Sequence, residues 1–324
     1  MFHALATAVL ALTTIVAPAD EQRTAPGPSE VQVLAISVDG LNVSAIEQLG
    51  ATGAPTFHRL LDEGAGTLNA RTEVEQTVTL PNHTSMMTGR RIAAAKGGHG
   101  VTWDDDRPSM TVQKAAGHGV ASVFSAVHAD GGTTALYTTK EKFGLYERSW
   151  PKGIDTFTEN ENQKKLVSLA RADLRDGAPT FTFLHVSLPD RYGHAYGGMS
   201  ARYLGAVKRT DAQLGTLLDA LDGSSVTVIL TADHGFKTGA TDHSARRDLE
   251  NYRIPFLTWG AGVDRADLYD LNPAYRDPGT ARPSYAGKQP VRNGDVANLA
   301  ASLLGLPAVP GSDLDSDLSL TLTR

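Results

Sequence analysis

Aspartate and histidine side chains follow three separate hydrophobic segments of the sequence, at the points where strands are expected to end. Asp39 follows Val31–Val38, the motif PDRYGH follows residues 179–188, and TADHG begins at the end of residues 225–231. Ligands of open α/β sheets bind beyond the carboxyl ends of the strands. A lone aspartate there is usually a turn former, but the recurrence favours a site for divalent ions, which suit such ligands. The expected ligands are Asp39, Asp190, His194, Asp233, His234 and, nine residues beyond His234, His243.

The stretch TVTLPNHTSMMTGR, residues 77–90, contains a candidate nucleophile. Pro81 suits the first turn of a helix, which places Thr79 at or just before the N-cap. The free N–H groups and the helix dipole favour a phosphate there. Coordination of Thr79 to a metal would lower the pKa of its hydroxyl, and Asn82 could donate to a phosphoryl oxygen. The alternative is a threonine that only caps the helix.

Hydrophobic runs alternate with amphipathic segments along the chain. Near-continuous apolar runs predict strands buried on both faces, and segments with one apolar stripe predict helices. The alternation predicts an α/β fold, a three-layer sandwich whose central, mostly parallel sheet is flanked by helices. The expected strands are Val31–Val38, Gly119–Val127, Pro179–Leu188, Ser225–Thr231 and Arg253–Gly260, and the expected helices are Ser200–Leu221 and Gly294–Leu306, the latter capped near Asp295.

The composition excludes several functions. The 324 residues carry a net charge of −6 and no run of Lys or Arg, so we expect no nucleic-acid-binding surface. Cysteine is absent, so any metal must be held by His, Asp or Glu.

The N-terminus predicts export. Residues 5–19 form an uncharged apolar run that ends in Ala17-Pro18-Ala19, so residues 1–19 are interpreted as a signal peptide. Residues 20–30 are a polar linker, and residues 31–324 are expected to form a single catalytic domain with no transmembrane segment. Because the run lacks a preceding Lys or Arg, an N-terminal anchor or a misassigned start is the alternative. The destination could be the periplasm, the cell wall or the medium.

The motifs VDG, TLPNHTSMMTGR, GGHGV, PDRYGH and TADHG, in this order, resemble the alkaline phosphatase superfamily, and within it the type I phosphodiesterase/nucleotide pyrophosphatase family. The resemblance extends from about residue 31 to residue 312 and implies two zinc ions and a threonine nucleophile. It implies that Asn82 binds the phosphoryl group. It further implies that one zinc is held by Asp39, Thr79, Asp233 and His234, and the other by Asp190, His194 and His243.

Other polar residues near the motifs could be structural or could belong to the site. We expect His83 and His185 to be packed structurally and His99 to shape a loop. Lys140 and Lys142 could face the substrate, although a solvated surface position is favoured.

Two features nearer the C-terminus also stay open. Asp242 is a ligand, a partner of a ligand or a surface residue, with the last two favoured. Residues 261–293, rich in Pro, Gly, Asp and Arg, are either a surface excursion or a wall of the site.

Together these features predict a metal-dependent phosphoric ester hydrolase, most simply a phosphodiesterase that acts on a small phosphate ester or nucleotide. An alkaline phosphomonoesterase or a phosphonate hydrolase would use the same residues. Leu80 stands where the family commonly has phenylalanine, which leaves the substrate open. An exported protein that only binds metal or phosphate is the non-enzymatic alternative, and the sequence leaves the oligomeric state undetermined.

Overall fold

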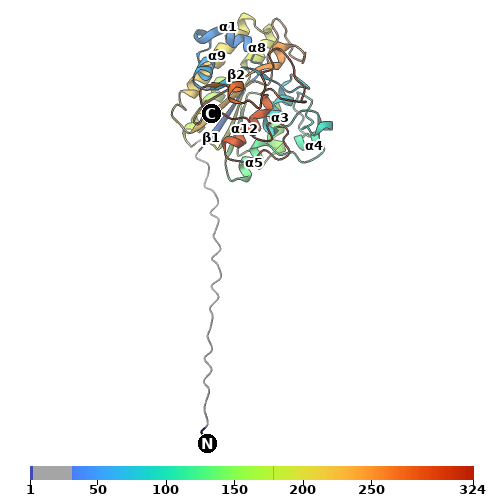
Figure 1. The fold of residues 1–324 in the computed structure, drawn as a ribbon. Helices are drawn as coiled ribbons and strands as arrows, with labels where there is room; N and C mark the ends of the chain where they lie inside the picture. The colour runs from blue at the N-terminus through green and yellow to red at the C-terminus, as the bar shows by residue number, and fades with distance from the viewer. Residues whose placement is uncertain (3–30, 178) are drawn as a thin grey trace.

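The hydrophobic runs of the sequence form a mixed, mostly parallel sheet at the centre of the computed structural model, which describes residues 1–2, 31–177 and 179–324 (Figure 1). The sheet has eight strands in the order β4-β3-β5-β1-β6-β7-β2-β8. Neighbours from β4 to β6 are parallel, whereas β7 is antiparallel to both β6 and β2. The strands are β1 (Gln32–Val38), β2 (Ala65–Arg71), β3 (Thr134–Thr138), β4 (Thr156–Glu159), β5 (Phe181–Val186), β6 (Val226–Thr231), β7 (Arg253–Gly260) and β8 (Ala266–Asp267).

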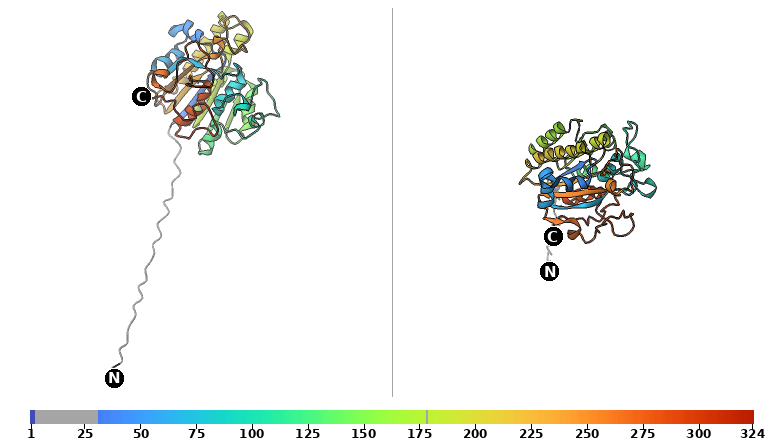
Figure 2. Two further views of the ribbon diagram at one scale, coloured as in Figure 1. Left: turned by 45° about the vertical axis from the view of Figure 1, so that its right-hand side comes forward. Right: turned by 90° about the horizontal axis from the view of Figure 1, so that it is seen from above.

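Helices flank both faces of this sheet and confirm the sandwich (Figure 2). One group consists of α1 (Val43–Gly53), α2 (Pro55–Glu63), α7 (Gln163–Arg175), α8 (Leu188–Tyr196) and α9 (Ala201–Leu218), which pack on one another. The other contains α3 (Thr79–Thr88), α5 (Val123–Ala129) and α12 (Val296–Leu303). The shorter elements are α4 (Val112–Ala116), α6 (Gly144–Ser149), α10 (Leu249–Tyr252), α11 (Leu268–Leu271), η1 (Ala94–Lys96), η2 (Glu141–Phe143) and η3 (Asn293–Asp295).

Four of the five predicted strands are present, as β1, β5, β6 and β7. Every residue of β5 and β6 is buried, as expected for strands covered on both faces. The predicted apolar stripe is also confirmed, because its residues in α9 and the following turn are at most 2% exposed: Tyr203, Val207, Leu214, Leu217, Leu218 and, in the turn, Leu221.

The strand predicted over Gly119–Val127 is wrong. The chain forms helix α5 over Val123–Ala129 instead, and a capping box between Ser122 and Ser125 fixes where it begins. The edge of the sheet is formed by the next segments, β3 and β4, which the sequence analysis did not predict.

The helix predicted over Gly294–Leu306 is present as η3 and α12, but Asp295 does not cap it with its side chain. Its carboxylate accepts the backbone N–H of Arg292 and closes the preceding 3-10 turn.

The predicted signal peptide and linker lie almost entirely outside the described residues and stay predictions. Across the described part of the chain, none of the helices combines the length and the apolar character that a membrane crossing requires.

Residues 261–293 pack against the loop that precedes α3. Arg282 donates to the backbone carbonyl of Val74, and Tyr285 donates to the carboxylate of Glu73. The segment therefore supports the loop that leads to Thr79, and its final residue, Asn293, reaches the site described next.

Candidate metal centre and nucleophile

The order of the sheet brings the predicted ligands together. Strands β5, β1 and β6 are direct neighbours, and each is followed at its carboxyl end by acidic or imidazole groups. Asp39 follows β1, α8 after β5 carries Asp190 and His194, and Asp233 and His234 follow β6. The five ligands that follow β5, β1 and β6 thus share one edge, as the sequence predicts.

Within the described part of the chain, each of the three carboxylates has one oxygen bound by the protein and one without a hydrogen-bond partner. Asp39 Oδ2 pairs with the ring of His185 at 2.9 Å, and Asp233 Oδ1 accepts the N–H groups of Gly40 and His234. Asp190 Oδ2 pairs with Lys140 at 2.7 Å. The buried atoms without a hydrogen-bond partner include Asp39 Oδ1, Asp190 Oδ1, Asp233 Oδ2 and His234 Nε2. A buried polar atom without a partner is costly, so these atoms fit a cation that they would bind.

The three histidines present the matching nitrogen. In His194, His234 and His243, Nδ1 lies 2.7–2.9 Å from a backbone carbonyl oxygen and must donate to it. Each neutral ring therefore carries its proton on Nδ1 and leaves the Nε2 lone pair free, which is the form that binds a metal.

The free atoms form two groups. Asp190 Oδ1 lies 3.3 Å from His194 Nε2 and 3.5 Å from His243 Nε2, and the two nitrogens are 3.2 Å apart. In the second group, His234 Nε2 lies 3.2 Å from Asp233 Oδ2 and 3.5 Å from Asp39 Oδ1.

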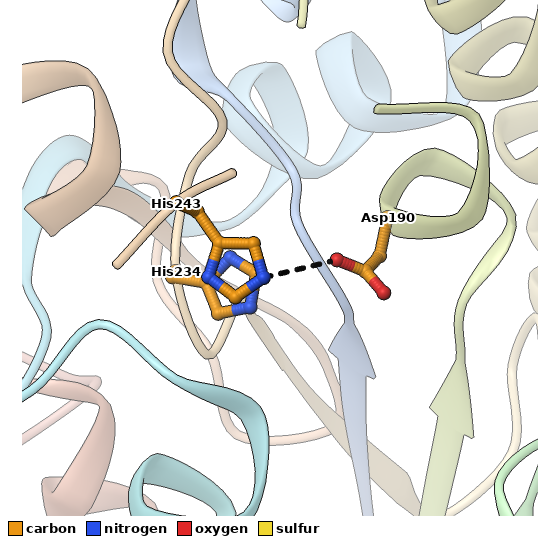
Figure 3. Close-up of side chains that lie close together, drawn as sticks. All are labelled: Asp190, His234 and His243. Atoms are coloured by element: carbon orange, nitrogen blue, oxygen red, sulfur yellow. Dashed lines mark ion pairs between the residues drawn. The ribbon is translucent and has the colours of Figure 1, made fainter. Parts of the chain in front are cut away.

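The two groups adjoin each other. The rings of His234 and His243 stack with centroids 3.6 Å apart, and both face Asp190 (Figure 3). The structure thus brings the predicted ligands together, while their division between two ions stays a prediction.

The charges of the cluster also fit added cations. Asp39, Asp190 and Asp233 are all buried, and Lys140 is the cation among them. Burial and the charge of Asp39 raise the pKa of Asp233 well above its usual value. Burial would also raise the pKa of Asp39, but Lys140 and the hydrogen bond from His185 hold it well below its usual value. One ammonium does not neutralise three carboxylates, and divalent ions would supply the missing charge.

Thr79 is buried, and its Oγ lies 3.5 Å from Lys140 Nζ, the group that also contacts Asp39 and Asp190. Thr79 is the first residue of α3, and Val78 is the N-cap. The sequence placed Thr79 at or just before the N-cap, so the helix begins at least one residue earlier than predicted. Pro81 stands in the first turn, as predicted. The next N–H of the helix, that of Leu80, donates to the carboxylate of Asp104.

Asn82 lies in the first turn of α3, is buried, and hydrogen-bonds the loop that precedes the helix with both atoms of its amide group. Its amide nitrogen donates to the carbonyls of Gln76 and Val78, and its oxygen accepts the N–H of Glu73. Asn293 donates to the same oxygen and lies near the carbonyl of Asp233. The arrangement ties the loop of the nucleophile to the end of β6, and a bond from Asn82 to a phosphoryl oxygen stays a prediction that needs one of these bonds to be exchanged.

The role of Lys140 was not predicted from the sequence. The favoured surface position is wrong, because the lysine side chain is only 17% exposed and pairs with Asp39 and Asp190. Lys142 also has a partner, the carboxylate of Asp104 at 2.8 Å.

The histidines expected to be structural, His83, His99 and His185, are all buried. His83 bonds the carbonyl of Thr79 and the hydroxyl of Ser37, and His99 contacts the hydroxyl of Ser85. His185 is a core residue that also hydrogen-bonds Oδ2 of Asp39, one of the predicted metal ligands. Asp242 is exposed and accepts the N–H of Ser244, so the structure gives it a surface position.

This fold and this cluster of ligands define a scaffold of the alkaline phosphatase superfamily. The model of the family described as "Type I phosphodiesterase / nucleotide pyrophosphatase" matches residues 33–286. The chain therefore belongs to the type I phosphodiesterase/nucleotide pyrophosphatase family.

Curated relatives include two kinds of enzyme. GPI ethanolamine phosphate transferase 1 of Yarrowia lipolytica is 29% identical over 164 residues, which are 47% of this chain and 16% of that protein. Human ectonucleotide pyrophosphatase/phosphodiesterase family member 1 is 34% identical over 70 residues, 20% of this chain and 8% of that protein. The matched region thus spans less than a fifth of either relative.

A solved structure confirms the fold. Murine ectonucleotide pyrophosphatase/phosphodiesterase 5, in an inactive threonine-to-alanine variant complexed with AMP, matches with a TM-score of 0.66 and 14% identity. The match covers 89% of this chain and 99% of the murine chain.

Proposed function

We propose that the chain is a metal-dependent phosphoric ester hydrolase of phosphodiesterase/nucleotide pyrophosphatase type, with Thr79 as its nucleophile. The observation that carries this proposal is the convergence, within the described part of the chain, of three unpartnered carboxylate oxygens and the unpartnered Nε2 of His234 beside a buried threonine hydroxyl; these groups come from three neighbouring strand ends. The murine relative, described as inactive when a threonine is replaced by alanine and as complexed with AMP, supports both the nucleophile and a nucleotide-like substrate.

The reaction has two displacements at phosphorus. In the first, Thr79 Oγ forms a bond to phosphorus while the bond to the leaving oxygen breaks; that oxygen takes the electron pair, and the threonine proton balances its charge. In the second, the oxygen of water attacks phosphorus, the bond to Thr79 Oγ breaks, and a proton of the water restores the threonine hydroxyl. Two divalent ions, which we infer to be Zn²⁺, would stabilise the charge that develops on these oxygens and lower the pKa of the Thr79 hydroxyl.

The residues around Thr79 fix where the first bond forms. His83 hydrogen-bonds the carbonyl of Thr79 and the hydroxyl of Ser37, and so fixes the first turn of α3. The Asn82 bonds hold the loop on its other side. Preorganised groups of this kind avoid reorganisation during the reaction.

A cavity of about 370 Å³ beside the site offers room for a small substituent of the substrate. It is lined by three cationic and three acidic side chains, together with Thr139 and Ser187: Lys140, Lys142, Arg191, Asp106, Glu141 and Glu161. This mixture suits a small polar molecule.

Hydrolysis of bis-p-nitrophenyl phosphate and p-nitrophenyl phosphate, with and without EDTA, tests the proposal. The wild type should prefer the diester and lose activity in EDTA. Thr79→Ala should lower kcat by roughly 1,000-fold or more while keeping its metal content. Thr88→Ala, at the other end of α3, is the control and should keep wild-type kcat. Wild-type turnover by Thr79→Ala would exclude the nucleophile, and preference for the monoester would favour a phosphomonoesterase.

Transfer to an alcohol is a second candidate, favoured by the similarity to GPI ethanolamine phosphate transferase 1. Its first displacement is the same, but a hydroxyl group of an acceptor then replaces water. The two are separated by adding ethanolamine or glycerol to the diester reaction and measuring products by mass spectrometry. A hydrolase should give mainly the phosphate monoester that hydrolysis releases, whereas a transferase should give mainly the phosphate diester of the added alcohol.

A further inference from the structure

Lys140 occupies the space between the two groups of ligands. It follows β3 in the sequence, and its Nζ lies 2.6 Å from Asp39 Oδ2 and 2.7 Å from Asp190 Oδ2. The same nitrogen lies 3.5 Å from Thr79 Oγ. One ammonium thus contacts a carboxylate of each group and the nucleophile.

The lysine and the expected divalent ions use different atoms of these carboxylates. Lys140 contacts Oδ2 of Asp39 and of Asp190, whereas the unpartnered atoms are Oδ1 of both. Lys140 can therefore stay in place when the ions bind. The contacts with Lys140 leave Oδ1 of Asp39 and of Asp190 directed towards Nε2 atoms of the histidines, 3.3–3.5 Å away.

The backbone around Lys140 is fixed on the neighbouring strand. The hydroxyl of Thr138 contacts the ring of His185 and accepts the N–H of Lys140. The hydroxyl of Thr139 lies 2.6 Å from that of Ser187. The position of the ammonium is thus set by hydrogen bonds within the described part of the chain and needs no bound ion.

We propose that Lys140 is a fixed cation of the catalytic centre, which joins the two ligand groups through Asp39 and Asp190 and stabilises negative charge on Thr79 Oγ. The contact with Thr79 is catalytic only if the proposed function holds, whereas the link between the carboxylates is independent of it. With two divalent ions, three carboxylates and Lys140, the site carries a charge of about +2 before substrate binds. A phosphate ester would therefore enter an attractive field although the whole chain is acidic.

Lys140→Met removes the charge and keeps much of the stem, and Lys237→Met is the control because Lys237 also pairs with a carboxylate, that of Asp248, outside the site. In EDTA, Lys140→Met leaves two buried carboxylates without their cation and should lower the melting midpoint by at least about 5 °C. Saturating Zn²⁺ should reduce this deficit, because the ions supply charge to the same carboxylates. Lys237→Met should melt like the wild type, within about 2 °C, in both conditions.

At equal zinc content, kcat of Lys140→Met should fall at least about 100-fold. A wild-type melting midpoint in EDTA, or a kcat within threefold of the wild type (roughly 0.6 kcal/mol), would overturn the proposal.

Lys140→Arg decides the case if Lys140→Met does not fold. It should keep the midpoint in EDTA and lose about tenfold in kcat, because a guanidinium fork does not reproduce the point charge; wild-type kcat would overturn the contact with Thr79. If Thr79→Ala stays active while Lys140→Met shows the EDTA-dependent loss, the proposed nucleophile fails and the link between the carboxylates stands.

Discussion

Glu73 should make the stability of the protein depend on pH between about 4.5 and 7. The side chain is fully buried in the loop before α3, and its Oε1 has no hydrogen-bond partner among the residues that the structure describes. Burial raises the pKa of Glu73 from 4.5 to about 7. Tyr285 contacts carboxylate oxygens of both Glu73 and Glu75 with its single hydroxyl. One phenolic proton cannot satisfy two carboxylates, so this geometry also favours a protonated Glu73.

The size of the effect follows from the shift. The folded state binds the proton of Glu73 more tightly than the unfolded state does. The contribution of Glu73 to the free energy of unfolding is therefore greatest below pH 4.5 and falls as the pH rises towards 7. Each unit of pKa difference corresponds to about 1.4 kcal/mol, so the loss reaches ~3 kcal/mol above pH 7.

Glu73→Gln keeps the shape and removes this loss. The variant should be more stable than the wild type by ~3 kcal/mol at pH 8 and by less than ~1 kcal/mol at pH 5. Urea unfolding at both values measures the difference. Glu147→Gln, an exposed glutamate on α6, is the control and should stay within ~0.5 kcal/mol of the wild type. Equal stability of Glu73→Gln and the wild type at pH 8 would refute the reasoning.

Two further predictions concern the ligands themselves. His185→Ala removes the 2.9 Å partner of Asp39 Oδ2 and should weaken zinc binding by about 10- to 100-fold, measured by calorimetric titration; unchanged affinity would show that His185 only fills the core. Asp233→Asn should lose zinc, because an amide replaces the charge of a buried carboxylate, and full occupancy by elemental analysis would show that Asp233 is no ligand.

The strands that position the site were predictable from the sequence. β1, β5 and β6 are near-continuous apolar runs, and each ends within a few residues of the polar groups that form the cluster. The same rule that places ligands at the carboxyl ends of strands then predicted which residues meet.

The edges of the sheet were less predictable. Gly119–Val127 is apolar enough for a strand, but the Ser122–Ser125 capping box starts a helix within it. β2 contains glycine and asparagine, which are rare in strands, and its pairing with β7 overrides this local preference.

Lys140 and His185 show what a single sequence does not contain. A lysine in a polar stretch of sequence is normally predicted to be exposed to solvent. The pairing of β3 with β5 brings Lys140 to the carboxylates instead. His185 lies opposite Ser37 in the β1–β5 register, so its distance from Asp39 depends on how these two strands align. Long-range pairing of this kind is set by the whole sheet.

Zinc-edge anomalous diffraction from crystals grown with Zn²⁺ tests the metal centre most directly. The account predicts two peaks, about 2.0–2.1 Å from Nε2 atoms of the three histidines, with Oδ1 of Asp39 and Asp190 and Oδ2 of Asp233 as the other ligands. Absence of a peak within reach of His234 and Asp233, at full zinc saturation, would contradict it.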